Sequence, residues 1–523
     1  MPDRYSAEVA AHVLASGGNA MDAAIASAFV LAVTAPEAGN IGGGGFMLAR
    51  IDGKAIFLDF REVAPAAATR DMYLDAKGGI IDGASLTGHR AIGVPGTVAG
   101  LWAAHRRYGK WPWPELVAPA IALAENGFEI PPQLVKSMND EMPRLKDTTH
   151  FARYFGNMRM GETFRQPVLA ATLRRIAEDG AVGFYEGETA RLLLAEMRRG
   201  GGLITAADLA GYQPRWREPL TAKWRDFEIF AAPPPSSGGF AVIQLLKMKD
   251  DLAKDFAGLA HNSPQYIHLT AEMEKRVFAD RAEYLADPDF VPQRIDELIA
   301  DDYVARRAAE VNSLSISPTD SVRPGLEPHA TTHFSIVDQA GNAVALTYTL
   351  NTDFGSGVVV EGGGFLLNNE MDDFSAKPGV PNYYGMAGAD SNAIQPGKRM
   401  LSSMSPTILI KDGAVSMVLG TQGGSTIITS VYQTIVNVLD FHMAPEEAVA
   451  ATRFHHQPGP GNLITYTIMN PLPEDVIHAL GERGYRVVPH EWEIGDLQLI
   501  WRGGGEWRAA SDPRGRGESR IIH

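Results

Sequence analysis

Two threonines, Thr331 and Thr349, are spaced so that their hydroxyl groups could act together. They bound a stretch of alternating apolar and polar residues around Gly341, which is typical of two strands joined by a tight turn. Residues directly opposite in such a hairpin have Cβ atoms roughly 4.5–5.5 Å apart. Pairing outward from Ala340 predicts an apolar face (Ile336 with Val344, Phe334 with Leu346, Thr332 with Tyr348) and a second face (Ser335 with Ala345, His333 with Thr347, Thr331 with Thr349). A slip of one residue would exchange the faces, so the apolar pairing is expected to fix the register.

Threonine is the nucleophile that remains once the common signatures of other nucleophiles are excluded. There is no cysteine, no Gly-x-Ser-x-Gly elbow and no His-Glu-x-x-His motif. By itself the hairpin is more simply explained by the frequent use of threonine in strands. A threonine hydroxyl becomes reactive beside a base, and the α-amine of an N-terminal threonine, with a pKa of about 7.7–8.0, can be that base. The irregular region 312–329 ends just before Thr331, whose hydroxyl could attack the Ala330 carbonyl and cut the chain there.

Several further residues suggest binding chemistry. Arg61 follows a predicted strand, where it could form a surface ion pair with Asp59 or Glu62, or clamp a carboxylate with its planar fork. The glycine run 39–45 lacks the Gly-Lys-Ser/Thr of a phosphate loop, so it predicts a turn where backbones approach closely. The glycine turn 420–425 opens a helix, whose first N–H groups form an anion site. The adjacent His455 and His456 should point apart and lack a third zinc ligand, which favours a structural role.

Helices and strands that must position these residues can be predicted from periodicity. Residues 5–35 show a helical pattern broken at Gly17 and Gly18, and residues 46–60 form a strand pair around Asp52-Gly53. Further helices are expected at 98–108, 113–126, 264–284 and from the 420–425 turn to Leu439, and further strands at 363–367, 407–411 and 415–419. Periodicity alone therefore supports a mixed α and β protein, with helices dominating the first two-thirds.

Composition limits the classes of partner. The 523 residues carry a formal net charge of −15, which argues against nucleic acid or an anionic membrane surface as a partner. The absence of cysteine excludes disulfides, thiol catalysis and thiolate metal sites. The longest apolar stretch, 23–35, is too short to cross a bilayer and is expected to be a buried helix. No secretory signal is visible after Met1.

Long motifs in order along nearly the whole chain resemble the gamma-glutamyltransferase (gamma-glutamyltranspeptidase) family of N-terminal nucleophile hydrolases. The resemblance rests on residues 17–24, 39–46, 59–62, 233–239, 331–335, 350–352, 372–375, 401–406 and 510–514. It implies an α+β fold, a four-layer αββα sandwich, built jointly by a large subunit, 1–330, and a small subunit, 331–523, that form one compact unit. It implies no cofactor and no metal.

The resemblance also implies roles for individual residues. Thr331 would be the nucleophile, Thr349 would hydrogen-bond its hydroxyl, and Gly423 and Gly424 would donate N–H groups to the oxyanion. A substrate α-carboxylate would be held by Arg61, Ser402 and Ser403, and its α-amine by Asn351, Glu370 and Asp373. The segment 378–385, with Tyr384, resembles a lid over the site. Bacterial members usually carry an export signal, which implies a periplasmic or secreted protein; since none is visible here, a cytoplasmic location stays open.

The expected activity is gamma-glutamyl transfer and hydrolysis through a gamma-glutamyl-threonine ester. Donors would be glutathione or other gamma-glutamyl amides, and acceptors would be water, an amino acid or a dipeptide. One alternative is a related acylase of the glutaryl-cephalosporin or poly-gamma-glutamate type. A glutaryl group has no α-amine, so Asn351, Glu370 and Asp373 favour the glutamyl substrate. The other alternative is an unprocessed, inactive relative that acts as a binding protein.

Overall fold

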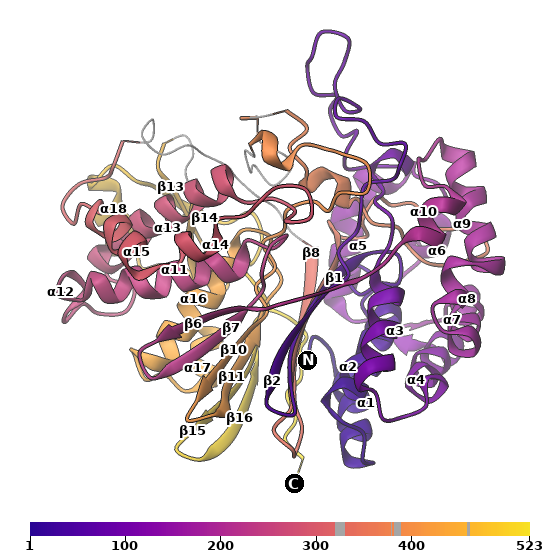
Figure 1. Cartoon of the computed structure of the whole chain (residues 1–523), viewed down its shortest axis with the longest axis horizontal. Coiled ribbons are helices and arrows are strands. Elements are labelled where there is room, and N and C mark those ends of the chain that lie inside the picture. Colours follow the sequence, from indigo (N-terminus) through magenta and orange to yellow (C-terminus); the bar gives the residue numbers. More distant parts are fainter. Residues whose placement is uncertain (319–329, 378, 381–388, 458–460, 523) are drawn as a thin grey trace.

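The computed structural model describes residues 1–318, 330–377, 379–380, 389–457 and 461–522, and its centre is a pair of antiparallel sheets (Figure 1). The first sheet has the order β5 (Arg215–Arg217), β2 (Lys54–Asp59), β1 (Gly44–Ile51), β9 (Ala343–Asn351) and β8 (Ala330–Val337). The second has the order β16 (Glu506–Ser511), β15 (Gln498–Gly503), β11 (Ala414–Gly420), β10 (Thr407–Lys411), β7 (Phe227–Ala231) and β6 (Leu220–Trp224).

The two sheets face each other, since β11 contacts both β8 and β9, and β10 contacts β1. Helices cover the outer face of each sheet. On the first sheet these are α1 (Arg4–Ala15), α2 (Ala20–Thr34), α3 (Thr97–Tyr108), α4 (Trp113–Asn126) and, farther out, α5 (Pro132–Leu145), α6 (Phe151–Phe155), α7 (Pro167–Asp179), α8 (Val182–Tyr185), α9 (Gly187–Gly200) and α10 (Ala206–Gly211). The predicted αββα sandwich is therefore confirmed.

The second sheet is covered by α11 (Gly238–Asp251) and α16 (Thr426–Leu439), with α13 (Pro264–Tyr284) outside them. The remaining elements of this half are α12 (Ala253–Phe256), α14 (Ile295–Leu298), α15 (Asp301–Ala309), α17 (Pro445–Ala450), α18 (Glu474–Glu482) and a small sheet of β12 (Phe454–His456), β13 (Leu463–Tyr466) and β14 (Arg486–Pro489). Elsewhere lie the pair β3 (Phe128–Glu129) and β4 (Thr163–Phe164) and the 3₁₀ turns η1 (His89–Ala91), η3 (Glu370–Asp373) and η4 (Asp390–Asn392).

Helix α2 shows why the first layer is stable. Asn19 and Asp22 form a capping box at its start, which satisfies backbone N–H groups that have no partner within the helix. Every residue of α2 is buried, as expected for a helix that is apolar on all sides. It packs against α1, α4 and the hairpin strands β8 and β9. The apolar stretch 23–35 is therefore the buried helix that the sequence predicts, and no helix among the described residues is long and apolar enough to span a membrane.

Most predicted elements are present with bounds within one or two residues, but the strand predicted at 363–367 is wrong. That segment makes tight turns, and its ladder is a single bridge between Val359 and Leu366. Gly362 and Gly364 have φ values of 73° each, in the left-handed region that glycine tolerates and a regular strand does not use. Two glycines within three residues therefore break the strand that the apolar neighbours suggested.

Candidate active site

The predicted hairpin has the predicted register. Thr331 pairs with Thr349, His333 with Thr347 and Ile336 with Val344, and Gly341 turns the chain with φ 79°. The apolar face of the hairpin packs into the core beneath α2, whereas its second face lies between the two sheets. Both faces are therefore buried, which explains why this strand pair contains so few charged residues.

The hairpin ladder is interrupted where the chain is predicted to be cut. The register shifts by a bulge between Ala330 and Thr331. Ala330 pairs with Asn351, and one residue of β9 is left without a paired residue on β8. Asn351 has φ 80°, an uncommon conformation for a residue with a side chain. Bulges and strained residues of this kind redirect side chains and concentrate at functional sites. Here the irregularity lies beside the Thr331 hydroxyl, which donates to Thr349 Oγ1 at 3.3 Å.

The glycine run packs against the strand that carries Thr349. A Cβ atom added to Gly43 would lie 2.0 Å from the Thr349 carbonyl oxygen, and one added to Gly45 would lie 2.4 Å from that of Thr347. Asn40 spans the same gap, since its Nδ2 donates to the Thr349 carbonyl at 2.8 Å. The prediction of close backbone approach in this run is confirmed, and the contact fixes the position of β9.

His333 fills the space between the sheets. Its ring nitrogens contact the hydroxyls of Thr347 at 2.7 Å and Ser335 at 3.1 Å, and burial lowers the pKa of His333 to about 3. A Cβ atom added to Gly420 would lie 2.4 Å from the ring, so glycine at that position makes room for it. The imidazole is therefore neutral, engaged on both sides and unsuited to act as the base for Thr331.

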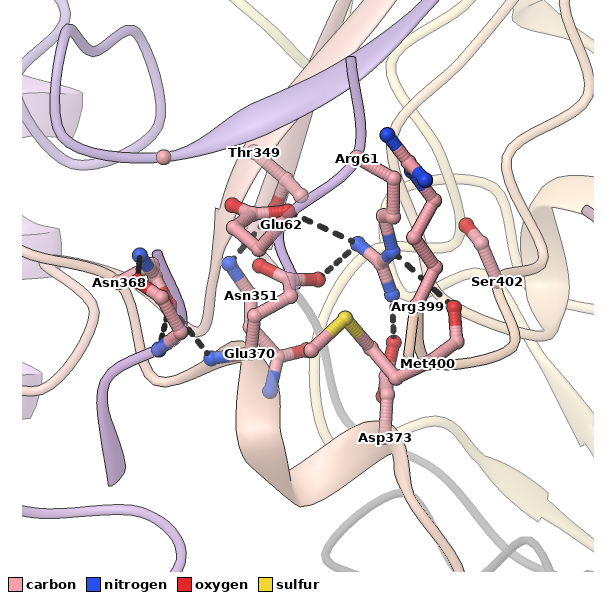
Figure 2. Close-up of polar contacts among 12 residues, drawn as sticks. Arg61, Glu62, Thr349, Asn351, Asn368, Glu370, Asp373, Arg399, Met400 and Ser402 are labelled. Atoms are coloured by element: carbon pink, nitrogen blue, oxygen red, sulfur yellow. Dashed lines mark hydrogen bonds and ion pairs between the residues drawn. The ribbon is translucent and has the colours of Figure 1, made fainter. Parts of the chain in front are cut away.

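Arg61 is the centre of a buried ionic cluster (Figure 2). Its guanidinium pairs with Glu370 and Asp373, lies 3.8 Å from Glu62 and donates to the carbonyl of Met400 at 3.4 Å. The side chains of Arg61, Glu62 and Glu370 are almost inaccessible to solvent. Arg61 is thus neither the surface residue of the simpler interpretation nor an unoccupied clamp, because its partners are the carboxylates predicted to bind an amine.

Burial sets the charges in this cluster. It raises the pKa of Glu62 to about 8 and the pKa of Glu370 well above its ordinary value, although the positive charge of Arg61 opposes both shifts. The pKa of Asp373 is raised by burial as well, and Arg61 and Arg281 oppose that change. Because three carboxyl groups share one low-dielectric region, their full ionisation near neutral pH is disfavoured. A cationic group bound beside them would favour the ionised forms.

The two predicted serines are held by hydrogen bonds from Ser237, Arg281 and Met404. The Ser402 carbonyl accepts from both the N–H, at 2.8 Å, and the hydroxyl, at 2.7 Å, of Ser237. Ser402 Oγ accepts from the N–H of Met404 at 3.2 Å, and Ser403 Oγ accepts from Arg281 at 3.1 Å. The bend 233–239 therefore positions Ser402, and Arg281 of α13 positions Ser403, relationships that the sequence did not reveal.

The glycine turn lies where β11 ends and α16 begins. Gly423 has φ 136° and Gly424 has φ 51°, both in the region that favours glycine. Among the described residues, the N–H groups of these two glycines have no hydrogen-bond acceptor. A helix start with such groups attracts negative charge. Gly424 lines the same cavity as Thr331, so a group that favours anions lies in the same wall as the Thr331 hydroxyl.

One cavity brings most of the predicted site together. Its wall includes Arg61, Thr331, Thr349, Asn351, Glu370, Asp373, Ser402, Ser403 and Gly424. Gly423 precedes Gly424 in the chain, and Tyr384 lies outside the described residues. The wall also contains Arg281 and Asn392, which sequence reasoning missed. Asn392 donates to the Asp373 carbonyl at 2.8 Å and accepts from the N–H of Leu401 at 3.1 Å, so it links the segment of Asp373 to that of the serine pair.

The histidine pair has the structural role that the sequence favoured. His455 contacts the hydroxyls of Ser425 at 3.2 Å and Thr429 at 3.1 Å, at the start of α16. His456 contacts the Leu463 carbonyl at 2.7 Å on the other side of its strand. The described residues contain no group of three or more side chains arranged to bind a metal.

Comparison with known proteins finds relatives along the whole chain. The family model "Gamma-glutamyltranspeptidase" matches residues 6–522. The glutathione hydrolase proenzyme of Pseudomonas aeruginosa is 57% identical over 521 residues, which covers 100% of this chain and 94% of the relative. The corresponding proenzyme of Escherichia coli is 44% identical and covers 98% of this chain and 89% of the relative. In a solved structure, the cephalosporin acylase of Bacillus halodurans aligns with a TM-score of 0.86 at 28% identity, covering 99% of this chain and 94% of that one.

The family model and the relatives match the chain along nearly its whole length. The cavity that Thr331 shares with the Arg61 cluster is consistent with that match. The chain belongs to the gamma-glutamyltranspeptidase family.

Proposed function

We propose that this protein is a self-processing enzyme that transfers or hydrolyses gamma-glutamyl groups. Cleavage between Ala330 and Thr331 would release the α-amine of Thr331 and divide the chain into a large subunit, 1–330, and a small subunit, 331–523. The observation that supports this proposal most directly is that Thr331 and the Arg61 ionic cluster line one cavity. Nucleophile and charged clamp are therefore available to the two ends of one small substrate.

The chemistry follows from the groups around Thr331. Its free α-amine would take the proton of its own hydroxyl, and the oxygen would attack the γ-amide carbonyl of glutathione or a similar compound. The developing oxyanion would accept hydrogen bonds from the N–H groups of Gly423 and Gly424. Collapse of the intermediate would pass the proton to the departing amine and leave a gamma-glutamyl ester. Water, an amino acid or a dipeptide would then attack the ester and restore the hydroxyl.

The ionic cluster suits a zwitterionic glutamyl group. Its α-carboxylate would pair with Arg61 and accept from Ser402 and Ser403. Its α-ammonium would pair with Glu370 and Asp373 and donate to the Asn351 side chain. Because the ligand brings one charge of each sign, it could insert between Arg61 and its carboxylates without adding net charge to a buried site. The γ-carbonyl is then the part left for the nucleophile.

A glutaryl or poly-gamma-glutamate acylase is the nearest alternative. A glutaryl group would bring only a carboxylate, which would compete with Glu370 and Asp373 for Arg61 and supply no ammonium group in return. Turnover of gamma-glutamyl-p-nitroanilide should therefore exceed that of glutaryl-p-nitroanilide by at least about a hundredfold, since an unpaired buried charge costs about 3–5 kcal/mol. Equal turnover of the two anilides would contradict the proposal.

An unprocessed binding protein is the remaining alternative, and a denaturing gel tests it. The purified protein should give two bands, and N-terminal sequencing of the smaller fragment should begin Thr-Thr-His-Phe. A single stable band near 56.5 kDa would favour the binding protein.

The family resemblance also favours a periplasmic or secreted location, which fractionation of the source cells would test.

A further inference from the structure

Arg281 is a second arginine in the cavity wall, and the roles described so far leave it unused. It lies near the end of α13, is 6% exposed and lines the cavity together with Thr331 and Ser403. Its Nε donates to Ser237 Oγ at 2.8 Å, and its Nη2 donates to Ser403 Oγ at 3.1 Å. One guanidinium therefore joins the helix layer to the segment that carries the serine pair.

These two bonds determine which way the hydroxyl groups donate. A guanidinium has only donors, so Ser403 Oγ must accept from Arg281 and direct its own proton elsewhere. Within the described part of the chain no group accepts that proton, while Ser403 faces the cavity. Ser237 likewise accepts from Arg281 and gives its proton to the Ser402 carbonyl at 2.7 Å. The first contact leaves the Ser403 hydroxyl ready to donate to an anion, and the second holds the backbone of Ser402 beside it.

We infer that Arg281 is a positioning residue: it orients the Ser403 hydroxyl as a hydrogen-bond donor for the α-carboxylate of the substrate, and through Ser237 it holds the backbone of Ser402 in place. The inference rests on the proposed gamma-glutamyl function and adds a residue to its specificity. Arg61 is already paired with Glu370 and Asp373, so the carboxylate needs donors that are not engaged with acidic side chains. A serine whose oxygen is occupied by a cation is such a donor, and charge-assisted polarisation strengthens it.

The test measures selectivity for the carboxylate. Gamma-glutamyl-p-nitroanilide is compared with 4-aminobutyryl-p-nitroanilide, which keeps the amine and lacks the α-carboxylate. In R281Q the ratio of the two kcat/KM values should fall about tenfold to a hundredfold, as for a lost hydrogen bond to a charged group. The change should come mainly from a higher KM for the glutamyl substrate, with turnover of the 4-aminobutyryl substrate nearly unchanged. Competitive inhibition by L-glutamate and by 4-aminobutyrate gives the same ratio by an independent measurement.

A double-mutant cycle tests whether Arg281 acts through Ser403. If it does, R281Q should lower the ratio less in the S403A background than in wild type, because the part of its effect that passes through Ser403 is already lost. R307Q is the matched control: Arg307 is a partly buried arginine that pairs with Asp280 of the same helix α13, and it lies outside the cavity wall. It should keep the wild-type ratio. R281K, which retains the charge but not the two-pronged fork, serves if R281Q fails to fold or process, and its ratio should also fall.

The outcomes separate the inference from the function on which it rests. Equal loss of both anilide activities in R281Q would indicate a purely structural role, and additive effects in the cycle would indicate direct contact with the substrate; either result overturns the inference. Wild-type protein that is processed but inactive on gamma-glutamyl-p-nitroanilide would instead refute the proposed function.

Discussion

The hydroxyl of Thr331 donates to that of Thr349 across 3.3 Å, and the N–H of Asn351 donates to the same Thr349 oxygen at 2.8 Å. Thr349 therefore fixes the direction of the Thr331 hydroxyl, the proposed nucleophile. Thr349→Val keeps the shape and removes the oxygen, so kcat should fall about tenfold to a hundredfold with little change in KM. Steady-state kinetics on gamma-glutamyl-p-nitroanilide measure this. Thr332→Val, on the opposite face of β8, should leave kcat unchanged.

Removing the proposed nucleophile should stop both maturation and turnover. Thr331→Ala lacks the hydroxyl for attack on the Ala330 carbonyl, so intact mass should show one chain of 56.5 kDa and no anilide hydrolysis. Thr331→Ser retains a hydroxyl and should process slowly. A Thr331→Ala protein that matures and turns over normally would remove the basis of the proposed mechanism.

The glycine turn should be sensitive to a single methyl group. Gly424→Ala adds a Cβ at φ 51°, which strains the turn and displaces its N–H groups from the oxyanion. Loss of one such donor costs about 2.7–4 kcal/mol of barrier, so kcat should fall by about 10²–10³. Gly413→Ala is a matched control, because Gly413 has φ 75°, has open space around it and lies in the remote β10–β11 turn. Similar kcat values for the two variants would argue against the oxyanion role.

Arg61 should matter for both binding and stability. Arg61→Gln leaves Glu370 and Asp373 without their cation in a buried site, which should reduce the free energy of unfolding by about 3–5 kcal/mol at neutral pH. Protonation of those carboxyl groups should make the loss smaller at pH 5, and urea unfolding at both pH values measures it. Arg61→Lys keeps the charge but not the fork, so it should fold better than Arg61→Gln and still show a raised KM. Equal stability of wild type and Arg61→Gln would contradict this account.

His333 should make the protein sensitive to acid. Its pKa is about 3 in the folded chain and about 6.5 when unfolded, so the unfolded state binds more protons between these values. The contribution of His333 to stability is therefore complete above pH ~6.5 and is lost as the pH falls toward 3. His333→Gln should lose less stability than wild type between pH 7 and 4.5, as read from urea midpoints. An identical loss in both proteins would show that His333 is not the group responsible.

How much of the site can be predicted from the sequence depends on how far apart in the chain the contacting residues lie. The hairpin register was predictable, because alternation over a short loop has one arrangement that buries Phe334 and Leu346 together. The partners of Arg61 were not, since Glu370 lies 309 residues away and its contact depends on how two segments cross. Arg281 was missed for another reason. The 264–284 pattern predicted a helix, but periodicity does not distinguish a polar side chain that lines a cavity from one that pairs within the core.

The order of strands has a consequence for the life of the mature protein. Backbone ladders cross the proposed cut twice, between β1 and β9 and between β7 and β10. Pulling the two pieces apart would break the centre of both sheets, so separation amounts to denaturation. Fragments from two differently labelled preparations, mixed under native conditions, should never swap. The two fragments of one precursor would stay together until the protein is degraded.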